Sequence, residues 1–288
     1  MGYTSYNSDS RSVRATSLGF YTKDVDDIFT QNKEGKIHES MEPSNALVRE
    51  ARDSETHPNS LPIIVALDVT GSMGRIPHEL VKDGLPNMVS NMIQRGIADP
   101  AILFLGIGDH TCDSAPLQVG QFESGDEELD LWLTRTWIEG HGGGNDGESY
   151  LLAWYFGSKH TAADAWEKRG QKGFLFTIGD EPCLKSLPKR TVEELMGKPS
   201  QSSYSHTDLL DAVKEKYDVF HLHIMQGSAG DRSLGSWQKL LGQHCIQVDD
   251  YEKVGNVIAD TVVQNWLSNE PVKPIKSDEP GKTGDFIR

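Results

Sequence analysis

Oxygen-bearing side chains follow one another at two-residue intervals directly after an apolar run. Residues 61–67 are apolar, and Asp68, Thr70 and Ser72 come next, on a turn that contains glycine. One carboxylate and two hydroxyls are hard oxygen ligands, which Mg²⁺ prefers while it retains several waters. Such a site needs a further ligand from another segment. The spacing therefore predicts one part of a divalent-cation site.

Two later segments can supply the missing ligands. Asp180 follows the apolar residues 174–178, which places a second acid at the end of a second strand-like run. The glycine-dense residues 140–149 contain Asn145 and Asp146, and glycine allows the backbone to approach an ion closely. Either side chain has an oxygen that can reach a cation, so the sequence leaves the choice between them open.

The segments that position these residues alternate between strand-like and helix-like patterns. Buried strands are predicted over 61–67, 101–107, 173–178, 219–225 and 245–248, a short edge strand over 116–122, and helices over 77–94, 129–137, 251–266 and from residue 149. This alternation predicts a doubly wound, Rossmann-like α/β fold, with helices on both faces of a mostly parallel central sheet and one short antiparallel edge strand. Ligands of such sheets bind beyond the carboxyl ends of the strands, where Asp68 and Asp180 stand.

The chain divides by composition into three parts. Residues 1–60 are rich in Ser, Asn, Asp and Thr, and we expect an N-terminal extension that packs on the main domain, with a short helix over 44–51 capped by Ser44. Residues 61–267 form the main domain. Residues 268–288 contain three prolines and few apolar side chains, which indicates a flexible tail.

The turn Asp68-Val-Thr70-Gly-Ser72-Met-Gly resembles the metal-ion-dependent adhesion site of von Willebrand factor A (vWA) domains, Asp-x-Ser/Thr-x-Ser. With the Asn145-Asp146-Gly-Glu loop, it looks closest to the hemicentin-like and alpha-kinase-associated subset. The resemblance covers residues 61–266. It implies that Asp68, Thr70, Ser72 and Asp180 hold one Mg²⁺, with Mn²⁺ or Ca²⁺ as alternatives. Asn145 stands where the family has a threonine, and either Asn145 or Asp146 could reach the ion.

In that family the partner's Asp or Glu fills the remaining coordination position. The resemblance therefore implies a non-catalytic protein-interaction module, an adaptor whose partner could be an AAA+ ATPase or another large assembly. Two alternatives stay open, namely a metal-assisted hydrolase or phosphoryl-transfer enzyme, and an assembly protein that the metal only stabilises.

Composition narrows the classes of partner and the location. The formal charge is −15, from 43 acidic and 28 basic residues, which argues against nucleic acid and anionic membranes as partners. The sequence has no apolar run long enough to span a bilayer, and residues 1–6 have neither the basic nor the apolar part of a secretory signal. From these absences we expect a cytoplasmic protein.

Several histidines are weaker candidates for chemistry. His221 and His223 alternate along one predicted strand and could bind zinc, but no third ligand stands at suitable spacing. We therefore expect buried, hydrogen-bonded histidines. His141 begins a His-Gly-Gly-Gly stretch like that of esterases, yet the Gly-x-Ser-x-Gly nucleophile motif is missing. His110, with acids at 109 and 113, is interpreted as part of a loop at the edge of the site.

Overall fold

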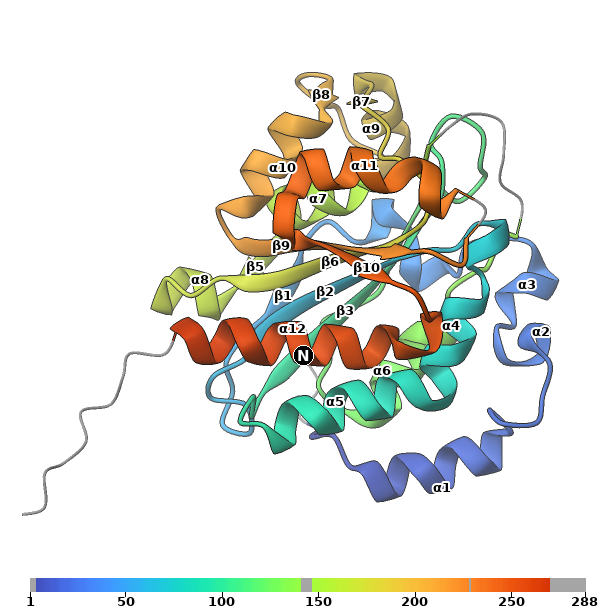
Figure 1. Ribbon diagram of the computed structural model, residues 1–288, viewed down its shortest axis with the longest axis vertical. Coiled ribbons are helices and arrows are strands. Elements are labelled where there is room, and N and C mark those ends of the chain that lie inside the picture. The colour runs from blue at the N-terminus through green and yellow to red at the C-terminus, as the bar shows by residue number, and fades with distance from the viewer. Residues whose placement is uncertain (1–3, 141–146, 228, 270–288) are drawn as a thin grey trace, which may run out of the picture.

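A computed structural model describes residues 4–140, 147–227 and 229–269, and only the backbone at 72, 268 and 269. Its centre is a six-stranded sheet (Figure 1). In spatial order the strands are β10 (Cys245–Val248), β9 (Tyr217–Ile224), β6 (Gly173–Gly179), β2 (Leu61–Asp68), β3 (Pro100–Ile107) and β4 (Leu117–Val119). All neighbours are parallel except β4, which runs antiparallel to β3. The predicted doubly wound α/β fold is confirmed.

Helices cover both faces of the sheet, so the central strands are buried on both sides. On one face lie α4 (Arg75–Glu79), η4 (Leu80–Gly84), α5 (Leu85–Gln94), α6 (Asp126–Thr134) and α12 (Val254–Asn269). On the other lie α7 (Leu151–Lys159), α9 (Lys189–Met196), α10 (His206–Lys214) and α11 (Gly230–Leu241). Each of the eight residues of β2 is buried, which explains its continuous apolar run.

The central position of β2 determines which side chains meet at the carboxyl edge. Leu67 lies opposite Ile178 of β6, and Asp68 lies opposite Ile107 of β3. The residues that follow these three strands therefore emerge side by side. They are the turn after Asp68, the loop after Ile107 and the segment that begins at Asp180.

The predicted helix over 77–94 contains a π-helical segment, η4, between α4 and α5. A π-helical turn leaves backbone carbonyls without their usual intrahelical partners. Arg11 of α1 (Ser8–Leu18) donates hydrogen bonds to two of these carbonyls, those of Val81 and Lys82. The side chain of Arg11 is 1% exposed, so a residue of the N-terminal segment is buried against η4.

The rest of the N-terminal segment runs along the main domain as short elements: α2 (Val25–Ile28), α3 (Gln31–Glu34), η1 (Glu39–Met41), η2 (Pro43–Asn45) and β1 (Arg49–Ala51). Strand β1 pairs in parallel with β5 (Thr161–Ala163). The helix expected over 44–51 is therefore wrong. Pairing with a strand more than 100 residues away prevails over the local helix signal.

The remaining elements are η3 (Gly71–Met73), α8 (Asp164–Arg169), β7 (Ser186–Leu187), β8 (Tyr204–Ser205), η5 (Gly242–His244) and η6 (Tyr251–Lys253). Within the described ranges, each helix is too short or too polar to cross a membrane.

Candidate functional site

Asp68 ends β2 and is 1% exposed. Its Oδ1 accepts hydrogen bonds from the Thr70 amide (2.9 Å) and the Thr70 hydroxyl (2.6 Å), and its Oδ2 accepts one from the Tyr150 hydroxyl (2.8 Å). Burial raises the pKa of Asp68 to about 6, although these hydrogen bonds act in the opposite direction. The negative charge of Asp180 adds to the rise.

Asp180 follows β6 and is also 1% exposed. Its Oδ2 accepts a hydrogen bond from the Ala229 amide (3.0 Å), just before α11. The Ser233 hydroxyl, in the first turn of α11, donates to the backbone carbonyl of Asp180. The start of α11 therefore fixes both the side chain and the backbone of this acid.

Two glycines allow the acids to crowd together. A Cβ atom at Gly179 would lie 1.9 Å from the Tyr150 hydroxyl and 2.9 Å from Asp68 Oδ2. A Cβ atom at Gly227 would lie 2.1 Å from Asp180 Oδ2. Since no side chain fits at such distances, glycine is required at both positions.

Glu148 is a third buried acid at this edge, and sequence reasoning assigned it no role. It is 5% exposed, and its Oε2 finds no hydrogen-bond partner among the described residues. Burial, then the negative charges of Asp68, Asp113 and Asp109, raise the pKa of Glu148 to about 10. The sequence signal was an acid that directly follows the last glycine of the glycine-dense stretch.

Asp109, beyond the end of β3, repeats the turn found after β2. It is 1% exposed, its Oδ1 accepts from the Thr111 amide (2.8 Å), and its Oδ2 accepts from the Thr111 hydroxyl (2.7 Å). The next residue, His110, contacts the Ser149 hydroxyl through Nδ1 at 2.7 Å, and burial lowers its pKa. An Asp-x-Thr turn therefore ends two neighbouring strands at the same edge.

None of the acids at 68, 109, 148 and 180 has an ion-pair partner within the described parts of the chain. Their oxygens are hard donors, which suits a divalent cation such as Mg²⁺. The described residues nevertheless contain no group of three or more His, Cys, Asp or Glu arranged to hold a metal. Asp68 already accepts three hydrogen bonds, and the described side chains make up only part of the predicted ligand set.

The predicted site residues divide into two groups. Asp68, Thr70 and Asp180 meet at one edge, where the Thr70 hydroxyl is bonded to Asp68. Asn145 and Asp146 lie outside the described residues, and so does the side chain of Ser72.

The two strand histidines form a buried chain of hydrogen bonds instead of a metal pair. Thr177 Oγ1 contacts His221 Nδ1 (3.0 Å), His221 Nε2 contacts His223 Nδ1 (3.2 Å), and His223 Nε2 donates to the Gly230 carbonyl (2.7 Å). Burial lowers the pKa of both histidines. This chain supports the start of α11, which in turn holds Asp180.

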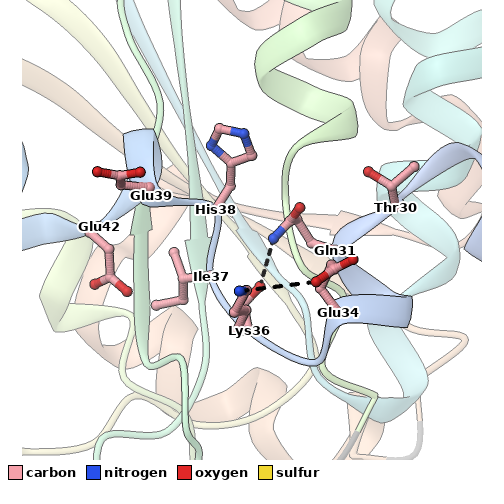
Figure 2. Close-up of a pocket in the computed structure, with 8 residues that line it drawn as sticks. All are labelled: Thr30, Gln31, Glu34, Lys36, Ile37, His38, Glu39 and Glu42. Carbon is pink, nitrogen blue, oxygen red and sulfur yellow. Dashed lines mark hydrogen bonds and ion pairs between the residues drawn. The ribbon is translucent and has the colours of Figure 1, made fainter.

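A pocket of about 500 Å³ lies in the N-terminal segment, away from these acids in the sequence (Figure 2). It is lined by Thr30, Gln31, Glu34, Lys36, Ile37, His38, Glu39 and Glu42. Figure 2 shows the ion pair between the Lys36 ammonium group and Glu34 (4.0 Å). It also shows the hydrogen bond that the Gln31 side chain donates to the backbone carbonyl of Lys36 (3.0 Å). Glu34 and Glu39 are exposed to solvent, unlike the acids at the sheet edge.

Comparison with known proteins finds likeness only among solved structures. No family model matches the chain, and no curated protein matches it. The pilus adhesin SpaC from Lactobacillus rhamnosus GG, in its open conformation, matches with a TM-score of 0.50 and 13% identity, over 75% of this chain and 31% of that one. The likeness is one of fold.

Two further structures match less well. Proximal thread matrix protein 1 from the mussel byssus has a TM-score of 0.47 and 9% identity, over 75% of this chain and 49% of that one. The vWF domain of the type V pili tip protein Mfa5 from Porphyromonas gingivalis has a TM-score of 0.42 and 9% identity, over 83% of this chain and 99% of that one. The sheet order is that of a doubly wound α/β fold, whereas membership of the vWA family and of its hemicentin-like subset stays a prediction.

The cytoplasmic location expected from the sequence is wrong on these findings. SpaC, which matches with a TM-score of 0.50, is a pilus adhesin, and this finding contradicts the expected cytoplasmic location. The expectation rested on the absence of a leader-like segment in residues 1–6. A missing segment carries no information about where a folded domain works.

Proposed function

We propose that the carboxyl edge of the sheet holds one divalent cation, and that the protein binds an acidic group of a protein partner through it. The observation that carries this proposal is the group of buried acids at 68, 109, 148 and 180, for which the described residues provide no ion-pair partner. Burying several like charges together is costly unless a cation joins them. Mg²⁺ is the proposed ion, with Mn²⁺ and Ca²⁺ as alternatives.

Each residue of the proposed site has a role that its chemistry supports. Asp68 and Asp180 supply negative charge from two neighbouring strand ends. Thr70 orients Asp68 through two hydrogen bonds. We propose that Ser72, and either Asn145 or Asp146, complete the ligand set from outside the described side chains. A bound Mg²⁺ would supply an open coordination position for a carboxylate of the partner.

We propose a binding role in preference to catalysis because the Ser149–His110 contact at this edge is not placed to act as a nucleophile–base pair. His110 Nδ1 lies 2.7 Å from Ser149 Oγ, which resembles the start of a nucleophile–base pair. Ser149 is 0% exposed, however, and its hydroxyl also accepts a hydrogen bond from the His110 amide (2.9 Å). A substrate carbon could not reach this oxygen, so the contact supports the loop instead.

The proposal is tested by affinity capture with immobilised protein in MgCl₂ and in EDTA, followed by mass spectrometry. Wild-type protein should retain partners in MgCl₂ that EDTA releases, and Asp68→Asn should not retain them. Arg190→Ala is the matched control, because Arg190 is an exposed residue of α9 whose side chain pairs with Glu194. Partners that bind equally in EDTA, or equally to Asp68→Asn, would contradict cation-dependent binding.

A further inference from the structure

A cavity of about 510 Å³ opens beside the turn that carries Thr70. It is lined by Gly71, Met73, Arg75, Ile76, Ile224, Gln226 and Tyr251. Gly71 and Met73 belong to η3, directly after Thr70, and Ile224 is the last residue of β9. The cavity therefore shares the carboxyl edge of the sheet with the buried acids, although none of those acids lines it.

The floor of this cavity is apolar. Met73, Ile76 and Ile224 are 3%, 2% and 0% exposed, and all three belong to the core on the α12 side of the sheet. They present aliphatic and thioether groups to the opening, with no charged side chain among them. A floor of this kind favours an aliphatic side chain of a ligand over a polar one.

The entrance of the cavity is polar and carries one cation. Gln226 Oε1 accepts a hydrogen bond from the Tyr251 amide (2.8 Å), which ties the end of β9 to η6. Arg75 is exposed, and the described part of the chain gives it no ion-pair partner. A guanidinium in this setting can bind a carboxylate through two parallel hydrogen bonds.

We propose that this cavity is the specificity subsite for the partner, and this inference rests on the proposed function. Its occupant is an acidic segment of the partner protein in which an aliphatic side chain lies close to two carboxylates. One carboxylate goes to the cation site, the aliphatic side chain enters the cavity, and the second carboxylate pairs with Arg75. Charge complementarity selects this occupant, because the entrance offers a cation and the floor offers only apolar groups.

The test uses a phage-displayed peptide library with one fixed Asp and randomised flanking positions, selected on the 288-residue protein in MgCl₂ and in EDTA. In MgCl₂ the selected peptides should carry an aliphatic residue and a second acid near the fixed Asp. Fluorescence anisotropy of a labelled consensus peptide should show that replacing its aliphatic residue by Gly weakens binding by about tenfold. Replacing its second acid by Gln should weaken binding by a similar factor of about ten.

The variant Arg75→Glu should remove the preference for the second acid and weaken the consensus peptide by more than about tenfold, because a like charge replaces an opposite one. Arg75→Lys should retain most of the binding. Arg190→Glu, the same charge change on the exposed face of α9, should have no effect. Calorimetric titration with Mg²⁺ alone should give the same affinity for Arg75→Glu as for wild type.

The outcomes separate the two proposals. If no library peptide depends on both Mg²⁺ and the fixed Asp, the proposed function itself fails. If Asp-dependent peptides appear without an aliphatic or acidic preference, or keep that preference in Arg75→Glu, only the subsite is overturned. If the consensus peptide binds more tightly after residues 270–288 are deleted, the chain's own C-terminal segment, which contains Asp285-Phe286-Ile287, is the occupant instead of a partner.

Discussion

Two of the regions of this molecule that bury acids treat them in opposite ways. In α6, Asp130 is paired with Arg11 (3.1 Å) and Arg14 (2.9 Å), and Asp126 is paired with Arg14 (2.7 Å). At the carboxyl edge of the sheet, four acids are buried, and no ion pair to any of them is found in the described residues.

The difference is visible in the electrostatics of each region. Burial raises the pKa of Asp130, but Arg11 and Arg14 oppose this rise. At the sheet edge, burial and the neighbouring acids together raise the pKa of Glu148 to about 10. Paired acids of the first kind hold α1 against α6, whereas uncompensated acids of the second kind are typical of sites that bind a ligand. A buried acid therefore indicates a binding site only where no basic side chain pairs with it.

The largest effect should come from breaking the compensated region. Arg11→Ala leaves Asp130 short of a partner and frees the Val81 and Lys82 carbonyls of the π-helical segment. The expected loss of unfolding free energy is about 3–5 kcal/mol, measured by urea denaturation. Arg190→Ala, which removes an exposed pair, should leave stability unchanged. A loss for Arg11→Ala no greater than that control would show that the pair is unimportant.

Addition of Mg²⁺ should stabilise only the region of buried acids at the carboxyl edge of the sheet. At a Mg²⁺ concentration about 100 times its Kd, the wild-type protein should gain about 2.7 kcal/mol of unfolding free energy over the EDTA-treated protein. Arg11→Ala should gain the same increment, since Arg11 lies in the compensated region. Urea curves recorded with MgCl₂ and with EDTA check both statements. An increment that disappears in Arg11→Ala would mean that the two regions are not independent.

Neutralising one acid in each region should change stability with opposite signs. In EDTA, Asp68→Asn should raise the unfolding free energy by about 1–2 kcal/mol, because one charge of an uncompensated buried group is removed. Asp130→Asn should lower it, because Arg11 and Arg14 lose their shared carboxylate. Thermal and urea denaturation of the two variants are compared side by side. Equal signs would remove the distinction between the regions.

The smallest effect should distinguish ligands within the proposed cation site. Ser72→Ala should weaken Mg²⁺ binding, measured by calorimetry, more than Asn145→Ala does. Asn145 has Asp146 beside it as an alternative oxygen donor, whereas the residues on either side of Ser72 are Gly71 and Met73, which have no side-chain oxygen. Equal losses, or a larger loss for Asn145→Ala, would show that the ligands have been assigned wrongly.

Much of the fold could be predicted because buried parallel strands have a simple sequence pattern. The runs at 61–67 and 173–178 became β2 and β6, within one residue of their predicted ends. The helix over 44–51 could not be corrected from local sequence, since β1 depends on its pairing with β5. The π-helical segment could not be predicted from local sequence either, because the hydrogen bonds to its carbonyls come from Arg11, about 70 residues earlier in the chain.

The site was predictable only where it coincides with strand ends. Asp68 and Asp180 were expected at one edge because parallel strands end there together, and the structure brings them together. The roles of Glu148 and Tyr150 were missed. The unpartnered oxygen of Glu148 and the buried hydroxyl of Tyr150 result from tertiary packing, which local sequence does not show. The repeated Asp-x-Thr turn at Asp109 was visible in the sequence and could have been found.

The central claim is that the uncompensated acids form a cation site, and calorimetric titration of Mg²⁺ into the apo protein tests it most directly. Wild-type protein should show one saturable site, which Asp68→Asn and Asp180→Asn abolish while their circular dichroism spectra remain those of folded protein. The absence of saturable binding in wild type, or unchanged binding in both variants, would contradict the account.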